Sequence, residues 1–533
     1  DYDKTIIYRP AASNSPLTYS EDYNTDRNWY VEARLNYDRK FGDHKVTALM
    51  LYNQSCNHYP LKRDESTQAD YPFIPRCYVG VVGRATYDYR TKYLLDVNMG
   101  YNGSENFAPG KTRFGLFPSF SGGWVVTAEN FMKKQKIVDY LKFRVSWGRV
   151  GSDVGSDTRF MYMPAVWTEN GSYSFGVDNP VGTPAYGIGT MGNELVSWET
   201  SDKQNYGIDT RFLNGRLSLS ADFFIEHRKG ILIRPNSTPA IIAMGLPDLN
   251  LGKVDNRGYE LTLGWRDEFK DFSYYLNGNV SYAKNKIVFM DEIPNEYAYM
   301  NQTGGSTERY TGQFRFDRLY QYSDFIDDGK GNLTLKPELD QPYVKVYPGD
   351  AKYFDLNGDK IVDNNDKEVT GYSRRPEYMF GLNGGFEYKN FSFSMQWLGA
   401  THVTKALDLS YRIPFTDCGK RGLLDYFPKE CWTPENQLGA TMPRPSDTSQ
   451  SWNADSSTLW LRDASYIRLK SVNFSYTLNN RALRKKLGIK SLVFSLSGYN
   501  LLTFSPLKIV DPEEQAGQYP LTKLYNIGMT INF

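Results

Sequence analysis

One acidic segment carries the clearest candidate for a ligand-binding site in this chain of 533 residues. Residues 355–366 read Asp-Leu-Asn-Gly-Asp-Lys-Ile-Val-Asp-Asn-Asn-Asp. Oxygen donors stand at positions 1, 3, 5, 7, 9 and 12, and position 7 contributes its main-chain carbonyl: Asp355, Asn357, Asp359, Ile361, Asp363 and Asp366. This is the ligand spacing of an EF-hand calcium loop, and hard oxygen donors suit Ca²⁺.

Two positions depart from that loop pattern. Lys360 stands at position 6, where glycine is usual, and Asp366 stands at position 12 in place of glutamate. The alternative interpretation is a solvated acidic turn. We predict a structural Ca²⁺ that orders the long connection in which this loop lies.

No arrangement of residues in the sequence indicates catalysis. We find no G-x-S-x-G motif, phosphate-binding loop or dinucleotide fingerprint in a strand–turn–helix setting. Asp222 and Glu226 share one face of a predicted strand and could be mistaken for an acid–base pair, but the polar lining of a lumen explains them more simply. A net charge of +1 gives no basic field for nucleic acid. We therefore predict that the chain is not an enzyme.

Two further groups of residues leave alternatives open. Cys418 and Cys431 are close in sequence and could form a disulfide or remain free. Aromatic residues between the predicted strands could stack on sugar rings or grip a peptide, and they could equally pack the loops: Trp167, Tyr173, Tyr299, Tyr310, Tyr411, Trp432 and Trp452. The sequence does not single out a substrate-binding residue among them.

The elements that carry these residues are strands with one apolar and one polar face. At the carboxy-terminus, Tyr525, Ile527, Met529, Ile531 and Phe533 alternate with polar residues and glycine. A period of two predicts a strand with one side against an apolar phase. The mean hydropathy of −0.56 is compatible with this, because alternation averages out. The same pattern predicts strands near 28–40, 43–56, 77–91, 93–106, 114–126, 140–152, 202–214, 216–229, 256–268, 271–287, 377–388, 391–403, 465–478, 490–503 and 524–533.

The connections between these strands alternate between short and long. Short ones include the Asn214-Gly215 turn, and the longest are 153–201, 288–376 and 404–464. Outer-membrane barrels have short periplasmic turns and long extracellular loops, whereas a soluble sandwich has no reason to sort its loops in this way. We predict an all-β fold, a transmembrane antiparallel β-barrel in the outer membrane, with these three long loops outside the cell.

The number of predicted strands indicates that the barrel is incomplete. Fifteen is odd, bacterial single-chain barrels have even strand numbers, and lipid does not tolerate an unpaired strand edge. We predict that residues 1–533 are the carboxy-terminal portion of a larger barrel. Strands 28–40 and 524–533 should then pair with strands from another segment.

Several motifs, in order, resemble those of one family. Ser465-Tyr-Ile-Arg-Leu-Lys-Ser-Val, Gly498-Tyr-Asn-Leu-Leu-Thr-Phe-Ser and Asp511-Pro-Glu are similar to the carboxy-terminal signature of the SusC/RagA family, the TonB-dependent outer-membrane transporters of Bacteroidetes. Trp198-Glu-Thr and Tyr347-Pro-Gly-Asp also fit this family. The resemblance spans most of the chain from about residue 80 onward.

The resemblance implies a barrel of about 22 strands, filled by an amino-terminal plug that this chain lacks. It implies TonB-dependent import of oligosaccharides from glycan breakdown, or of oligopeptides. The expected partners are TonB, reached through the missing amino-terminal region, the remaining strands and plug, a SusD-like surface lipoprotein that acts as a lid, and membrane lipids. The alternatives are a passive diffusion channel and an outer-membrane enzyme.

Overall fold

In the computed structural model of this chain, fifteen long strands form one antiparallel sheet, each paired with its neighbours in chain order. The structure describes residues 18–21, 27–58, 74–110, 112–153, 159–163, 167–176, 181–239, 241, 245–414, 424–445, 451–479, 485, 488–514 and 521–533. The sheet strands are β1 (Arg27–Phe41), β2 (His44–His58), β3 (Arg76–Tyr89), β4 (Tyr93–Ser104), β5 (Phe114–Val125), β6 (Val138–Ser152), β9 (Glu199–Phe212), β10 (Leu217–Ile233), β11 (Leu249–Phe269), β12 (Phe272–Phe289), β21 (Tyr378–Tyr388), β22 (Phe391–Thr401), β25 (Tyr466–Leu478), β26 (Ser491–Phe504) and β27 (Leu524–Asn532). The predicted all-β fold is confirmed, with a strand at each predicted position.

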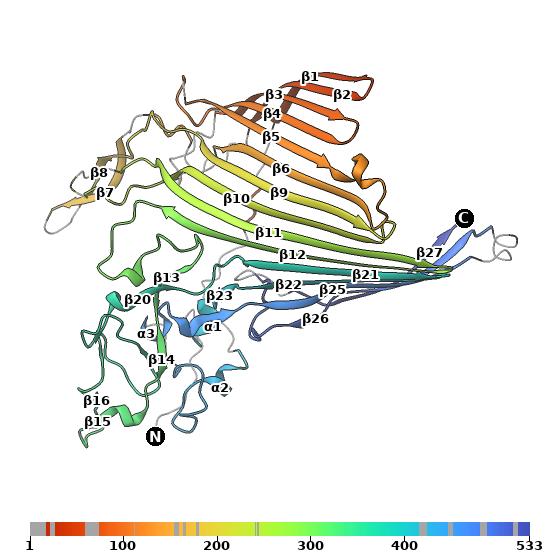
Figure 1. The fold of residues 1–533 in the computed structure, drawn as a ribbon. Helices are drawn as coiled ribbons and strands as arrows, with labels where there is room; N and C mark the ends of the chain where they lie inside the picture. Colours follow the sequence, from red (N-terminus) through yellow and green to blue (C-terminus); the bar gives the residue numbers. More distant parts are fainter. Residues whose placement is uncertain are drawn as a thin grey trace.

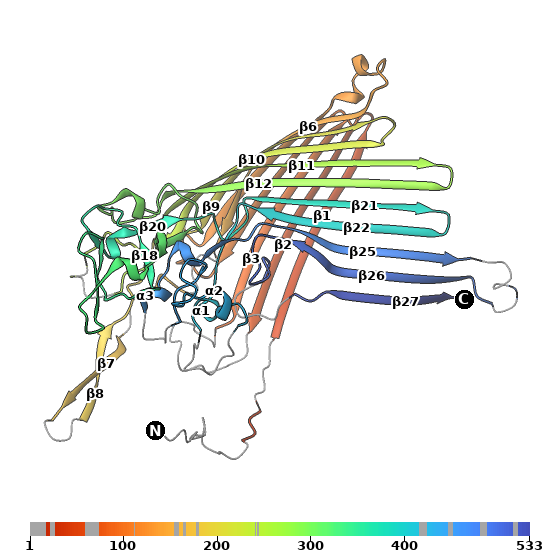
Figure 2. The same cartoon turned by 90° about the horizontal axis from the view of Figure 1, so that it is seen from below.

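The sheet is curved but open (Figures 1 and 2). β1 and β27 are its edges, and among the described residues they pair with β2 and β26 and not with each other. The open sheet agrees with the expectation that these two strands do not pair with each other, and their pairing with strands from another segment stays a prediction. β11 begins at Leu249 and not near 256, because its pairing with β10 continues past a bulge around Ile231.

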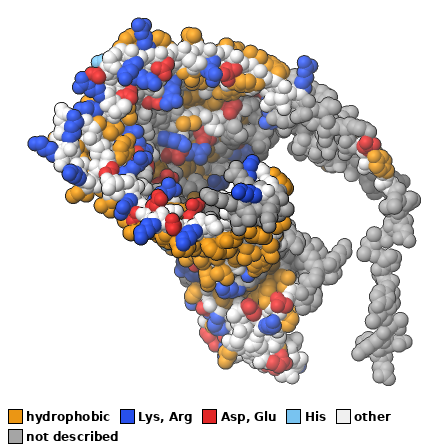
Figure 3. Space-filling view, turned by 90° about the vertical axis from the view of Figure 1, so that its right-hand side faces the viewer, with side chains coloured by type: hydrophobic (Ala, Val, Ile, Leu, Met, Phe, Trp, Pro, Cys, Tyr) orange, Lys and Arg blue, Asp and Glu red, His pale blue; other side chains and the backbone are white. Residues whose placement is uncertain are grey.

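Register places the alternating side chains on two distinct faces of the sheet. Leu219 lies opposite Leu263, and Phe223 opposite Tyr259, on the convex side. Asp222 lies opposite Glu260 on the concave side. Figure 3, from the end of the short turns, shows the hollow inside the sheet with charged side chains on its wall and hydrophobic side chains along its outer side. A barrel wall of this kind presents its apolar side to lipid.

The two ends of the sheet differ as the sequence predicts. At one end the strands are joined by tight turns, where Gly42, Asn214 and Gly215 adopt positive φ angles of 59°, 57° and 78°. Glycine and asparagine reach this left-handed region at little steric cost, which suits a two-residue hairpin turn. The long connections gather at the opposite end (Figure 2). The short and the long connections therefore lie at opposite ends of the sheet.

The long connections at that end form a compact body, which we call the outer-loop cap and define as residues 290–376, 402–414, 424–445, 451–464 and 505–514. The cap has its own hydrophobic core, whose largest fully buried side chains are those of Phe314, Tyr320, Tyr353, Leu407, Met442 and Trp460. These residues come from two connections far apart in sequence. The cap is thus a folded unit held by burial of apolar surface.

Short elements shape the cap and a separate hairpin. The short strands are β13 (Tyr310–Phe314), β14 (Phe316–Leu319), β15 (Phe325–Asp327), β16 (Leu333–Leu335), β17 (Gln341–Pro342), β18 (Ala351–Tyr353), β19 (Ile361–Val362), β20 (Lys367–Thr370), β23 (Thr404–Ala406) and β24 (Leu461–Asp463). The helices are α1 (Leu409–Arg412), α2 (Phe427–Glu430) and α3 (Ser451–Ala454). Within the described part of the chain, no helix has the length and apolar character needed to cross a membrane. β7 (Trp167–Phe175) and β8 (Val181–Ile188) form a hairpin that projects away from the sheet (Figure 1).

Candidate functional site

The concave wall of the sheet carries a network of paired charges. Arg144 donates to Asp209 through Nε at 2.7 Å and through Nη2 at 3.0 Å, and Nη2 also reaches Asp222 at 2.9 Å. The network borders a recess of about 500 Å³ that extends across β2 to β9 and includes Lys45 and Asp96. The wall therefore offers charged and polar groups to whatever occupies the lumen.

Asp222 and Glu226 do not form an acid–base pair in this wall. Asp222 is bound by Arg144, whereas Glu226 accepts a hydrogen bond from Ser201 Oγ at 2.6 Å and lies 3.7 Å from Lys203. Each carboxylate thus has its own cationic neighbour. The interpretation as polar lumen lining fits these contacts.

The predicted calcium loop is folded into a closed turn by its own main chain. Asp355 accepts hydrogen bonds from the amides of Gly358 at 2.6 Å and Lys360 at 2.8 Å. Asn357 Oδ1 accepts from the Asp359 amide at 3.0 Å, and Asp359 accepts from the Ile361 amide at 2.8 Å. The donor oxygens at positions 1, 3 and 5 therefore sit on one tightly wound segment.

Asp366 closes the other end of this loop from inside the protein. Its side chain is fully buried and accepts from the amides of Leu356 at 2.7 Å, Asn357 at 3.2 Å and Asp363 at 2.8 Å. Burial raises the pKa of Asp366, and the nearby charge of Asp355 adds to the shift. Position 12 therefore ties the beginning of the loop to its end.

The lysine at position 6 is accommodated by the loop geometry. Lys360 adopts a positive φ of 70°, the conformation for which glycine is usual at this position. Its Nζ pairs with Asp340 at 2.9 Å. No group of three or more His, Cys, Asp or Glu side chains in the described residues is already gathered as a metal-binding cluster. The loop has the right donors, but its carboxylates are engaged by main-chain amides.

Tyr299 attaches this loop to the rest of the cap. Its hydroxyl donates to the Asn365 carbonyl at 2.6 Å. Burial, followed by the charge of Asp366, raises the pKa of Tyr299 to about 12, so the hydroxyl stays protonated and able to donate.

The Tyr347-Pro-Gly-Asp motif is a buried anchor of the cap. Asp350 is 2% exposed and accepts from the Tyr347 amide at 2.8 Å, from Asn453 Nδ2 at 2.8 Å and from Arg444 Nε at 2.6 Å. Gly349 has a φ of +88°, and a Cβ there would lie 2.4 Å from the ring of Trp432. The motif therefore joins the 288–376 connection to the 404–464 connection.

The carboxy-terminal motifs form a second anchor. Arg468 is 1% exposed and pairs with Asp511 at 2.6 Å and with Glu513 at 3.0 Å. The amine of Lys405 donates to the Asp511 carbonyl at 3.0 Å. These contacts fasten the last long connection to the outer end of β25. Family motifs that could have marked a binding site act here as structural links.

The aromatic residues that the sequence left open divide into two groups. Tyr310, Trp432 and Trp452 are buried in the cap, with exposed fractions of 6%, 5% and 5%. Two others also contact cap residues: the carbonyl of Tyr411 accepts a hydrogen bond, and the hydroxyl of Tyr299 donates one. The two remaining aromatic residues lie on the projecting hairpin, Trp167 at 69% and Tyr173 at 65% exposure. Loop packing therefore explains most of this set, and the hairpin residues are available to a partner.

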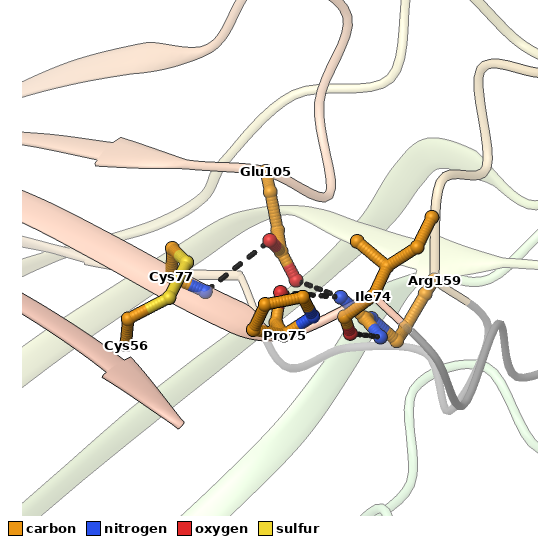
Figure 4. Close-up of a disulfide and its surroundings, with 6 residues drawn as sticks. All are labelled: Cys56, Ile74, Pro75, Cys77, Glu105 and Arg159. Atoms are coloured by element: carbon orange, nitrogen blue, oxygen red, sulfur yellow. Dashed lines mark hydrogen bonds and ion pairs between the residues drawn. A yellow bond between two sulfur atoms is a disulfide. The ribbon is translucent and has the colours of Figure 1, made fainter. Parts of the chain in front are cut away.

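A disulfide and a buried arginine fasten the outer ends of the first strands (Figure 4). Cys56 and Cys77 face each other across β2 and β3 and are bonded. The Cys77 amide donates to Glu105 at 3.2 Å, and Glu105 forms an ion pair with Arg159. Arg159 also donates to the Ile74 carbonyl at 2.7 Å. This bridge was not anticipated from the sequence.

The sequence left open whether Cys418 and Cys431 are bonded, and one member of this pair lies outside the described residues. Cys431 is a free and buried thiol, and burial raises its pKa to about 11. Cys418 lies outside the described residues.

Comparison with known proteins supports the same architecture. The family described as TonB dependent receptor-like, beta-barrel, matches residues 1–501. TonB-dependent receptor P3 of Formosa agariphila is 25% identical over 582 residues, covering 100% of this chain and 55% of the receptor. TonB-dependent receptor SusC of Bacteroides thetaiotaomicron is 25% identical over 482 residues, covering 85% and 44%. The chain spans about half the length of the curated relatives it matches.

A solved structure has the same fold. The RagAB peptide transporter superposes with a TM-score of 0.70 at 19% identity, over 96% of this chain and 55% of that one. The RagAB peptide importer in its open-open state gives a TM-score of 0.70 at 20% identity, over 95% and 54%. At this level of identity the likeness concerns the fold.

Proposed function

The chain belongs to the TonB-dependent receptors of the SusC/RagA type, β-barrel proteins of the outer membrane, and we propose that it forms the larger part of a nutrient importer. The observation that carries this proposal is the combination of a charged lumen wall, an apolar outer side and a large folded cap at one end. A simple pore needs no such cap. A receptor that selects cargo needs a structured outer surface.

The cargo that we propose is an oligomer too large for general diffusion, either an oligosaccharide or an oligopeptide. Paired charges such as Arg144 with Asp209 and Asp222 offer hydrogen-bond partners to both classes. The name of RagAB gives peptide as the cargo of that transporter, whereas SusC is named only as a receptor. Transport would be driven by TonB acting on a plug supplied by the rest of the parent protein.

An uptake experiment with the full-length parent protein tests this function. Cells that lack the gene should lose growth on either an oligopeptide mixture or an oligosaccharide mixture as sole source, and the complemented strain should regain it. Uptake should also stop when the proton-motive force is collapsed. Uptake that persists without the proton-motive force would identify a passive channel and contradict the proposal.

We propose that a SusD-like surface lipoprotein closes over the cap and the projecting hairpin. The hairpin supports this because Trp167, Tyr173 and Tyr186 are 69%, 65% and 63% exposed, and aromatic residues are enriched at protein interfaces. A stable lid should bury more than roughly 2,000 Å². Gentle detergent extraction of the native protein should therefore bring down a second polypeptide of lipoprotein type.

We also propose that the loop 355–366 binds one Ca²⁺ and stabilises the cap. Terbium luminescence and proteolysis of the cap, each with calcium or chelator, measure binding and order. Replacing Asp355 and Asp359 by Ala should abolish the calcium effect, which at 100 times the Kd is about 2.7 kcal/mol. Replacing Asp327 and Asp328 by Ala removes the same charge from a neighbouring turn and is the control. Equal protection with chelator and with millimolar calcium would contradict this proposal.

A further inference from the structure

The convex face of β10, β11 and β12 changes from aromatic to cationic side chains toward its outer end. Phe223, Tyr259 and Tyr282 lie opposite one another across the three strands. Two residues further out, the row continues with Arg257 opposite Lys284. A ladder step of two residues is about 6.6 Å, so the cations stand just outside the aromatic row.

The aromatic row marks the level of the membrane interface. The ring centroids of Tyr259 and Tyr282 are 5.4 Å apart, and those of Tyr282 and Tyr378 are 4.5 Å apart. Tyrosines concentrate where the hydrocarbon region meets the headgroups, and barrels carry aromatic girdles at that level. The cations beyond this row therefore lie at the level of the lipid headgroups of the outer leaflet.

A recess of about 790 Å³ lies among these cations and the loops that cover them. It is lined by Arg257, Lys284 and Lys286 from the strands and by Arg309 from the cap. Its carboxylates are partly engaged, since Glu377 pairs with Lys284 at 3.1 Å and Asp255 with His227 at 2.8 Å.

Three of the four recess cations have no carboxylate partner within the described residues. Arg257 and Lys286 are exposed and take part in no ion pair there, and Arg309 donates to the Gly371 carbonyl at 3.0 Å. With four cations facing two carboxylates, the recess has an excess of positive charge. It is therefore suited to an anionic group, and the guanidinium groups suit phosphate in particular.

An apolar groove adjoins the recess on its membrane side. The groove has a volume of about 580 Å³ and shares Phe223 with the recess. Ala221 forms its floor between larger neighbours in adjacent strands, Ile208 and Leu261, which lie opposite it in register. A soluble anion gains no favourable contact from an apolar groove, whereas an acyl chain can bury its apolar surface there.

We propose that this surface binds a lipid of the outer leaflet with a phosphate-bearing headgroup. The headgroup occupies the recess at Arg257 and Lys286, and an acyl chain lies in the groove over Ala221. The position supports a lipid because the apolar and cationic parts follow each other in the order of the membrane, from hydrocarbon to headgroup. The proposal rests on outer-membrane location and is independent of the cargo.

Native mass spectrometry of the full-length parent protein in detergent tests this lipid site. The probes are dioleoyl phosphatidic acid, dioleoyl phosphatidylcholine, dioleoylglycerol and inorganic phosphate. Phosphatidic acid should bind at least about tenfold more tightly than the other three, because the charge-assisted hydrogen bonds and the groove act together. Inorganic phosphate binding as tightly as phosphatidic acid would show an anion site without lipid selectivity and overturn the proposal.

Three variants separate the parts of the site. Arg257→Gln with Lys286→Gln should weaken phosphatidic acid binding about tenfold or more. Ala221→Phe should fill the groove and weaken lipid binding without changing phosphate binding. Lys270→Gln with Lys389→Gln removes the same charge at the short-turn end and should have no effect. An equal loss in this control, or no loss in the first variant, would overturn the proposal.

Discussion

Replacing Asp350 by Ala is expected to destabilise the outer-loop cap by about 3–5 kcal/mol while the fifteen-stranded sheet keeps its structure. The carboxylate is 2% exposed and is the shared acceptor for Arg444, Asn453 and the Tyr347 amide. Its removal takes this acceptor away from a mostly buried guanidinium, a buried side-chain amide and a main-chain amide at once. Breaking one side of a buried ion pair costs far more than the pair contributes, because the remaining charge has lost its water.

Hydrogen exchange of the full-length protein measures this effect. Amides of residues 310–376, 427–445 and 451–460 should exchange faster in the variant, whereas amides of β1 to β6 should be unchanged. Glu338→Ala is the matched control, since Glu338 lies in the same connection and is exposed. Global loss of protection in the sheet would show that the cap is not a separate unit. Unchanged protection in the cap would show that Asp350 is not an anchor.

The strands and their order could be predicted because each carries its own signal. Alternation in segments such as Leu217 to Ile225 fixes both the strand and its two faces, since a slip of one residue would turn every apolar side chain inward. The turns also have local sequence signals, such as the Asn214-Gly215 pair. The bulge near Ile231 could not be predicted, because it depends on how two strands pair beyond their alternating part.

The cap could not be predicted from the sequence because the contacts that form its core join residues far apart in the chain. Phe314 and Trp460 have no local pattern that indicates a shared core, yet both are fully buried in one. The disulfide between Cys56 and Cys77 had a signal that we did not use. The predicted strands end at 56 and begin at 77, and the two ends of a hairpin lie side by side. For the loop 355–366, the sequence predicts the donor spacing and a Ca²⁺, but it does not predict that main-chain amides engage the carboxylates of Asp355 and Asp366.

The second large effect is expected at the projecting hairpin of β7 and β8. The double variant Trp167→Ser with Tyr186→Ser should weaken binding of the lipoprotein lid by at least about 100-fold, since central aromatic residues of an interface often contribute 2 kcal/mol or more each. Both side chains are well exposed, at 69% and 63%, and they lie on one face because Trp167 pairs with Ile188. The substitutions remove contact area without burying a polar group, so the barrel should assemble normally.

The measurement is the dissociation constant between the full-length transporter variant and the lipoprotein that co-purifies with the native protein. Phe131→Ser with Ile137→Ser is the matched control, because these residues are 66% and 70% exposed at the short-turn end, on the opposite side of the membrane. A change in hydrophobicity alone would affect both variants equally, whereas a lid contact affects only the hairpin variant. If the hairpin variant binds the lipoprotein as tightly as the native protein does, the lid contacts the cap alone. The exposed apolar surface of the hairpin would then need a different partner.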